Sequence, residues 1–139
     1  MTTAVDTSVV LDLLTSDPRY AAASETALRS ARAQGRLIAC ECVLAELRPA
    51  LSSDSEMQLL LDDLGIDFVA GSRESAVLAG RHLAKFFQRG GSRGRIVADF
   101  LIGAHAQVHA DRLLARDRGF LRDYFSGLKV IDPATGRSR

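Results

Sequence analysis

The sequence predicts a three-layer α/β sandwich with a central parallel sheet of about five strands, and three observations support this fold class. Short apolar runs of strand length alternate with segments of helical period along the chain. The run RLIAC at 36–40 leaves no room for polar alternation, as expected of a parallel strand covered on both faces. The length of 139 residues, without an internal repeat or a low-complexity segment, fits one domain. We place that domain at 1–132 and a C-terminal tail at 133–139.

The expected elements follow from local signals along the chain. A first strand over 3–6 runs directly into a helix over 7–14. Asp17 and Pro18 are a typical helix start and predict a helix from 18 to 34. The further strands are expected at 36–40, 66–70, 112–116 and 128–132. The further helices are expected at 41–52 with an interruption near Pro49, at 53–63, at 73–88 and, after a basic loop at 88–95, at 95–109. The tail from residue 133 is expected to fray.

The composition is that of a globular protein, with 47% hydrophobic and 25% charged residues. No apolar run reaches the roughly 18 residues of a membrane span, and the N-terminal stretch lacks the basic segment of a signal peptide. Cys40 and Cys42 are too close in sequence for a good disulfide, and two ligands do not make a structural zinc site. These features predict a cytoplasmic protein with two reduced, buried cysteines and no membrane partner.

The charge is unevenly distributed, although the net charge is only +1. Residues 1–80 contain 6 Lys and Arg against 12 Asp and Glu, whereas residues 81–139 contain 12 Lys and Arg against 5 Asp. An arginine-rich half suits a phosphate-bearing partner. A solvated basic surface explains the same imbalance, so charge alone does not decide between the two.

Four acidic residues occupy positions from which they can reach one edge of the sheet. Asp6 ends the first strand, and Asp117 ends the fourth. Glu46 lies one to two turns into the helix after the second strand, and Asp99 lies in the first turn of the apolar helix 95–109. Ligands bind beyond the carboxyl ends of the strands in such sheets, so the four carboxylates could converge there.

Each acid also has a structural explanation of its own. Asp6 is a good N-cap for the helix that follows it, a role compatible with a site, and Asp117 suits a turn. Glu46 could be a solvated helix residue, although its helical neighbours are apolar. Asp99 is the hardest to explain, because its face of the helix is apolar; a buried ion pair with Arg95 is the alternative.

A shared site explains the four acids together. Two carboxylates about 4 Å apart repel by roughly 4 kcal/mol at an effective dielectric near 20, so a cluster of them requires a cation or raised pKa values. Hard oxygen ligands suit Mg²⁺ or Mn²⁺. One or two such ions can activate a water and hold a phosphodiester, and a nearby Arg can stabilise charge on the phosphate.

Four segments resemble a known family. AVDTSVVLDLL, VLAELRPAL, RGRIVADFLIGAHA and LLARDRGFLRDYF are closely similar to the four motif regions of PIN-domain ribonucleases, in particular the VapC toxins of type II toxin–antitoxin systems. The resemblance runs nearly end to end and includes the total length and the order of strands and helices. Each motif alone is a weak signal, whereas the four in this order and spacing are a strong one.

The resemblance implies an α/β/α sandwich and a metal-dependent endoribonuclease toxin that uses Mg²⁺ or Mn²⁺ to hydrolyse RNA, often transfer RNA. It implies that Asp6, Glu46, Asp99 and Asp117 are catalytic. It further implies that Asp6, Asp99 and Asp117 bind metal and that Glu46 binds metal or positions the attacking water. It also implies a homodimer and a VapB-like antitoxin that blocks the site.

The resemblance extends to residues that would support the acids. Ser8 matches the family's hydrogen-bonding position two residues after the first acid, and Thr7 lies between. Glu41 also follows the second strand and is the rival of Glu46, which we prefer because VLAEL is the matching stretch. The candidate RNA contacts are Arg93 and Arg95, of which Arg95 matches the basic position four residues before the third acid.

Other functions are possible from the sequence. A PIN fold without catalysis that binds RNA or protein would keep the fold but not the cleavage. A HAD-type phosphohydrolase also begins with an acid at a strand end, but it needs a second acid where this chain has Ser8. His105 and His109 have the i, i+4 spacing of a zinc pair, but no third ligand is evident. Asp12 is expected to be a surface charge that faces away from Asp6.

Overall fold

A computed structural model describes residues 1–91, 96–116, 120–134 and 137–138 of the chain. One six-stranded sheet forms its centre, with the strand order β3-β2-β1-β4-β5-β6. Strands β1 to β5 pair in parallel, and β6 pairs antiparallel with β5. The strands are β1 (Thr2–Val5), β2 (Arg36–Ala39), β3 (Ile66–Phe68), β4 (Arg112–Leu114), β5 (Val130–Asp132) and β6 (Arg137–Ser138).

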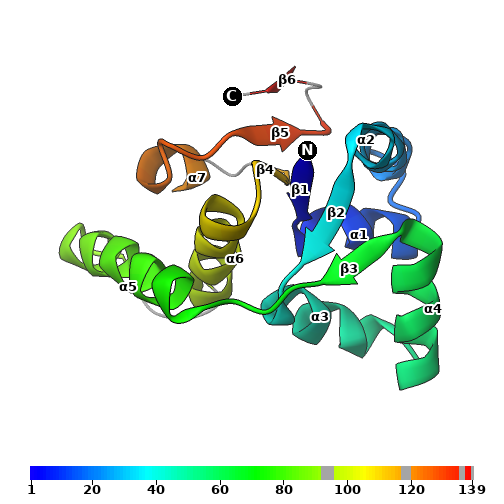
Figure 1. Cartoon of the computed structure of the whole chain (residues 1–139), viewed down its shortest axis with the longest axis horizontal. Helices are drawn as coiled ribbons and strands as arrows, with labels where there is room; N and C mark the ends of the chain where they lie inside the picture. The colour runs from blue at the N-terminus through cyan, green and yellow to red at the C-terminus, as the bar shows by residue number, and fades with distance from the viewer. Residues whose placement is uncertain (92–95, 117–119, 135–136, 139) are drawn as a thin grey trace.

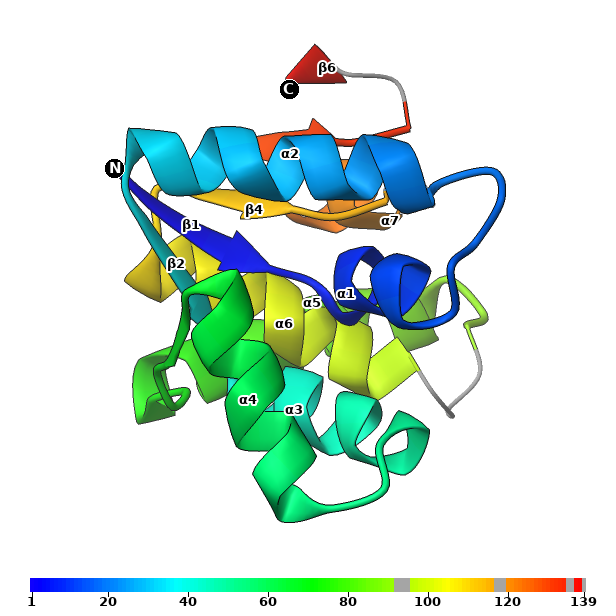
Figure 2. The same cartoon turned by 90° about the vertical axis from the view of Figure 1, so that its right-hand side faces the viewer.

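Helices pack on both sides of this sheet, as the predicted three-layer sandwich requires. Figure 1 shows α2 and α4 on one side of the sheet and α5, α6 and α7 on the other. Helices α1 and α3 lie near the carboxyl ends of β1 and β2 (Figures 1 and 2). The helices are α1 (Thr7–Leu14), α2 (Ala21–Gln34), α3 (Glu41–Leu47), α4 (Asp54–Leu64), α5 (Arg73–Gln88), α6 (Ile96–His109) and α7 (Phe120–Tyr124), and a 3-10 turn, η1 (Arg48–Ala50), follows α3.

The core lies between the central strands and the helices on either side. In β1, β2 and β4 nearly every residue is buried, which is why their sequences show no polar alternation. Phe100 of α6 and Phe125, just after α7, are the largest of the fully buried side chains. Within the described residues, no helix is long and apolar enough to cross a membrane.

The prediction of the second helix was wrong at its start. Asp17 caps a turn, since its Oδ1 accepts hydrogen bonds from the backbone N–H groups of Arg19 (2.8 Å) and Tyr20 (3.1 Å). The helix α2 therefore begins at Ala21, three residues later than the expected position 18. The interruption predicted near Pro49 is confirmed by the 3-10 turn η1.

Two elements of the C-terminal region were not predicted. Helix α7 has only five residues and lies between the fourth and fifth strands. Strand β6 lies in the tail that was expected to fray, where Asp132 pairs with Arg137 and Ile131 with Ser138. The sheet thus continues beyond the five predicted strands, and its last pairing is antiparallel.

Candidate active site

A cavity of about 400 Å³ lies at the carboxyl ends of β1 and β4. Residues of α1, α3 and α6 complete its lining. It is a smaller cavity than the one between α2 and β5, but its chemistry distinguishes it, because three carboxylates from three separate segments line it. The lining residues are Asp6, Thr7, Ser8, Leu11, Glu46, Asp99 and Arg116. The structure therefore places three of the four predicted acids around one space.

Asp6 reaches this cavity from the end of β1. It is the N-cap of α1, because its Oδ2 accepts hydrogen bonds from the backbone N–H of Ser8 (3.1 Å) and from the Ser8 hydroxyl. Its backbone N–H donates to the carbonyl of Leu114 (2.9 Å), which ties the end of β1 to the end of β4. Both hydrogen bonds to the carboxylate fall on one oxygen, and within the described chain the other oxygen, Oδ1, has no hydrogen-bond partner.

Glu46 reaches the cavity from the last turn of α3. Its Oε1 accepts a hydrogen bond of 2.7 Å from the Thr7 hydroxyl, so α1 and α3 are linked by side chains that are 39 residues apart in the sequence. Its other oxygen has no hydrogen-bond partner among the described residues. The rival Glu41 does not line the cavity, and its Oε2 accepts a hydrogen bond from the backbone N–H of Gly71 (2.8 Å).

Asp99 lies in the first turn of α6 and is half-buried. Its apolar neighbourhood is explained by the way the helix packs: Phe100 and Ile102 point into the core, whereas Asp99 lines the acidic cavity. The remaining predicted site residues, Asp117, Arg93 and Arg95, lie outside the described residues, so the proposed ion pair between Asp99 and Arg95 stays a prediction.

Arg116 is a site residue that the sequence reasoning missed. It lines the cavity, and its Nη2 lies 3.0 Å from Asp12 Oδ1, while its guanidinium stacks 4.3 Å from the centre of the Tyr20 ring. Its backbone N–H donates to the Ser8 hydroxyl (3.3 Å). Its Nε is buried without a hydrogen-bond partner in the described part of the chain. The adjacency of Arg116 to Asp117 in the fourth motif was the one available signal.

The expectation that Asp12 is a surface charge was wrong. Its side chain is 2% exposed and accepts a hydrogen bond from the Ser24 hydroxyl (2.7 Å) in addition to the ion pair with Arg116. Asp12 does face away from Asp6, as the helical period predicts. The face of α1 that carries Asp12 is covered by α2 rather than by water. A buried carboxylate of this kind requires the partners that it has.

The cavity suits a hard divalent cation. Its acidic ligands are all carboxylate oxygens, which Mg²⁺ and Mn²⁺ prefer, and Asp6 and Glu46 each keep one oxygen without a hydrogen bond inside the described chain. No choice of one carboxylate oxygen each from Asp6, Glu46 and Asp99 places all three within 4.8 Å of one another. Among the described residues, the ligand atoms of Cys40, Glu41 and Cys42 do lie that close together. Direct ligation of one ion by all three acids does not fit this spacing, so water would complete the coordination of any ion held here.

Burial works against metal binding at the cysteines, although Cys40, Glu41 and Cys42 lie close enough together to hold an ion. Both cysteines are free thiols; Cys40 is buried as predicted, and Cys42 is only half-buried. Burial raises the pKa of both thiols, that of Cys42 to about 12, which disfavours the thiolates that a metal requires. His105 Nε2 lies 2.8 Å from the Val69 carbonyl, and His109 Nε2 lies 3.1 Å from the Ser72 hydroxyl.

The fold and the cavity together define a class of protein: a three-layer α/β sandwich with an acidic cleft at the carboxyl ends of its parallel strands. The family model of the PIN domain matches residues 3–125. The chain therefore belongs to the PIN domain family, and the HAD-type alternative is wrong. A search of curated protein sequences gave no match to this chain.

Solved structures share this fold at low sequence identity. VapBC2 from Rickettsia felis, bound to a DNA fragment from its promoter, is 18% identical, with a TM-score of 0.70 over 95% of this chain and 98% of that one. VapBC-1 from nontypeable Haemophilus influenzae is 16% identical, with a TM-score of 0.70 over 96% and 98%. FitAcB from Neisseria gonorrhoeae is 20% identical, with a TM-score of 0.63 over 94% and 97%.

Proposed function

We propose that this chain is a divalent-metal-dependent endoribonuclease toxin of the VapC type, with its catalytic unit at 1–132, that acts in the cytoplasm under the control of a VapB-like antitoxin. The observation that carries the proposal is the convergence of Asp6, Glu46 and Asp99, from three separate elements, on one cavity beside Arg116. PIN domains are generally nucleases and typically use divalent metals, which agrees with this donor set.

In this proposal Asp6, Asp99 and the predicted fourth acid Asp117 hold Mg²⁺ or Mn²⁺, directly or through water, and Glu46 binds the metal or positions the attacking water. When bound, such an ion supplies an activated water and neutralises charge on a phosphodiester. The Ser8 hydroxyl and N–H hold Asp6 by one oxygen, and the Thr7 hydroxyl holds Glu46 by one oxygen. Asp6 and Glu46 thus keep a fixed orientation, and no described residue bonds to their second oxygens, which face an ion or the attacking water in this proposal.

The positive charge needed for the substrate comes from Arg116 in the described chain. Its guanidinium lies at the cavity, held by Asp12 and by the Tyr20 ring. A positioned cation of this kind stabilises the charge that develops on a phosphate during displacement. Arg93 and Arg95 are proposed as additional RNA contacts.

The partner is proposed from the same likeness. Solved structures of this fold include VapBC complexes, which contain a VapB antitoxin. We propose that this chain forms a homodimer and binds a VapB-like antitoxin over the acidic cavity. Size-exclusion chromatography with light scattering measures the first point; a monomeric mass at micromolar concentration would contradict it.

The test of the activity is cleavage of total transfer RNA by the purified chain with Mg²⁺, with Mn²⁺ and with EDTA. We expect cleavage that depends on metal and that is lost in Asp99→Asn, while circular dichroism shows the fold retained. The matched control is Asp62→Asn, the same change at an exposed acid of α4 far from the cavity, which should cleave as the wild type does.

Two results would contradict the proposal. Cleavage by Asp99→Asn at the wild-type rate would show that the acidic cavity is not the site. Metal binding by calorimetry without cleavage of any RNA would instead favour the alternative of a PIN fold that binds RNA or protein without catalysis.

A further inference from the structure

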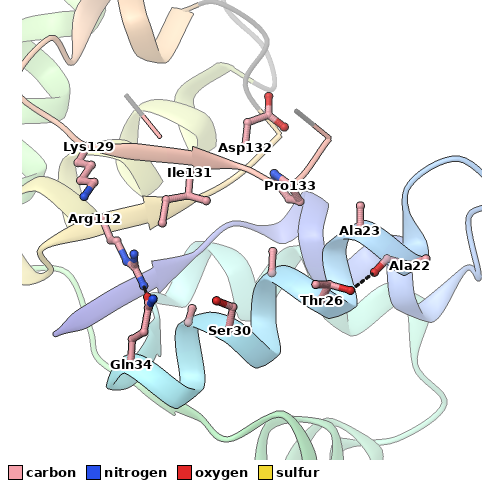
Figure 3. A pocket seen from close by; sticks show the side chains of 12 residues that line it. Ala22, Ala23, Thr26, Ser30, Gln34, Arg112, Lys129, Ile131, Asp132 and Pro133 are labelled. Carbon is pink, nitrogen blue, oxygen red and sulfur yellow. Dashed lines mark hydrogen bonds between the residues drawn. The ribbon is translucent and has the colours of Figure 1, made fainter. Parts of the chain in front are cut away.

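A second and larger cavity, of about 640 Å³, lies between α2 and the strands β4 and β5. It shares no lining residue with the acidic cavity. Figure 3 shows it as a groove along one face of α2, with Ile131 and Pro133 of the β5 region opposite. Its volume lies within the range of roughly 300–1,000 Å³ typical of small-molecule sites.

The groove exists because the face of α2 turned toward β5 carries small side chains. Ala23, Ala27 and Ala31 line it together with Thr26 and Ser30, and α2 rises by ~18 Å between its first and last lining residues. Larger side chains at these positions would close the space against Ile131. Most of the lining is therefore apolar, and the groove has room for an alkyl chain or an aromatic ring.

One end of the groove holds a buried guanidinium that has no acidic partner among the described residues. Arg112 of β4 is 6% exposed, yet its hydrogen-bond partners in the described chain are neutral: Nε donates to the Thr3 hydroxyl (2.8 Å) and Nη2 donates to the Gln34 amide oxygen. Across the described ranges, no carboxylate lies within 4.0 Å of this guanidinium. Buried guanidinium groups are normally paired, because an uncompensated charge in a protein interior is costly.

A second cation lies at the same end. Lys129, which precedes β5, lines the groove, and Figure 3 shows it beside Arg112. The acidic lining residue, Asp132, lies toward the opposite end near Pro133, where its Oδ1 accepts a hydrogen bond from the N–H of Ala134 (2.9 Å). The groove is therefore positively charged at the end that holds Arg112 and Lys129, and its acidic residue lies toward the other end.

We propose that this groove binds a small amphipathic carboxylate, with the carboxylate between Arg112 and Lys129 and the apolar body along the alanine face of α2. Within the described ranges, two of the five N–H donors of Arg112 are engaged, which leaves donors for a charge-assisted hydrogen bond to a carboxylate. A singly charged head matches a site in which one cation is buried and the other is exposed. The site is independent of the acidic cavity, so its failure and the failure of the nuclease proposal are separate results.

The experiment is isothermal titration calorimetry of the full chain with octanoate and with the uncharged 1-octanol. We expect saturable binding of one octanoate and an affinity for octanol at least tenfold weaker. In a protein NMR titration, octanoate should shift the signals of Ala23 and Ala27 rather than those of Asp6 and Asp99.

Two variants and one control locate the site. Lys129→Glu should weaken octanoate binding at least tenfold, whereas Lys85→Glu, the same charge change on the exposed side of α5, should leave it unchanged. Thr26→Phe adds a ring at an exposed position of the groove and should abolish binding by filling it. These positions are preferred to Arg112, whose substitution could unfold β4.

The proposal is overturned by any of three results. Octanoate and octanol could bind equally, Lys129→Glu could behave as Lys85→Glu does, or the wild type could show no saturable binding. Circular dichroism of each variant ensures that a loss of binding reflects the groove rather than the fold.

Discussion

The ion pair between Asp12 and Arg116 gives the sharpest test of the packing, and Asp12→Ala is the perturbation. At 3.0 Å, and at an effective dielectric near 20, the pair attracts by about 5 kcal/mol. Desolvation of the two charges offsets much of this, and Arg116 keeps 32% of its side chain exposed, so solvent reduces the remainder. The substitution also leaves the Ser24 hydroxyl without its acceptor. We expect a loss of about 2 kcal/mol in the free energy of unfolding.

Urea denaturation of the wild type and of Asp12→Ala measures this loss directly. A double-mutant cycle with Arg116→Met then isolates the pairwise part, since the two residues are in contact. A coupling energy below about 0.5 kcal/mol would refute the reasoning, because it would mean that burial of Asp12 depends on Ser24 and the surrounding packing rather than on Arg116. The same variant tests the site, because Arg116 loses the ion pair that helps the Tyr20 ring to hold it at the cavity.

Three further predictions concern separate features. Thr7→Val removes the hydrogen bond to Glu46 and should lower the rate of RNA cleavage about tenfold with little change in stability, which a single-turnover assay would show. Burial lowers the pKa of His82, so folding disfavours its protonated form; stability should fall as the pH drops below about 6.5, and the slope of stability against pH between 5 and 7 should be shallower in His82→Phe. Gly103→Ala places a Cβ 2.9 Å from Cε2 of Phe125 and should lower the melting temperature, by an overpacking penalty of about 1–3 kcal/mol; an unchanged melting temperature would show that the ring moves aside.

The fold was predictable where the signals are local. Helices α1 and α5 have the expected bounds, because their apolar periods and flanking caps lie within the segment itself; Ser72, for example, caps α5 through a reciprocal hydrogen-bond pair with Ser75. Helix α7 was missed, because five residues are too few to show a period.

The sequence allowed prediction of those site residues whose positions depend only on the order and direction of the strands. The rule that parallel strands present their carboxyl ends at one edge brought Asp6, Glu46 and Asp99 together. The same rule says nothing about side-chain partners, so the ion pair of Asp12 with Arg116, which spans 104 positions of the sequence, could not be read from helical phase. Burial of Asp12 depends on how α2 packs over α1.

The pairing of β1 has a consequence for the order in which the acidic cavity is assembled. The first strand of the chain occupies the centre of the sheet and pairs with β4, where Thr3 lies opposite Arg112 and Val5 opposite Leu114. During synthesis β1 can pair with β4 only after more than a hundred further residues have been made. Pairing between segments so far apart in the sequence is slow to form. The N–H of Asp6 donates to the Leu114 carbonyl, so the end of β1 is tied to the end of β4 only in the assembled sheet. A nascent or truncated chain that lacks β4 therefore lacks this hydrogen bond and Arg116, so the acidic cavity is assembled only when the chain is nearly complete.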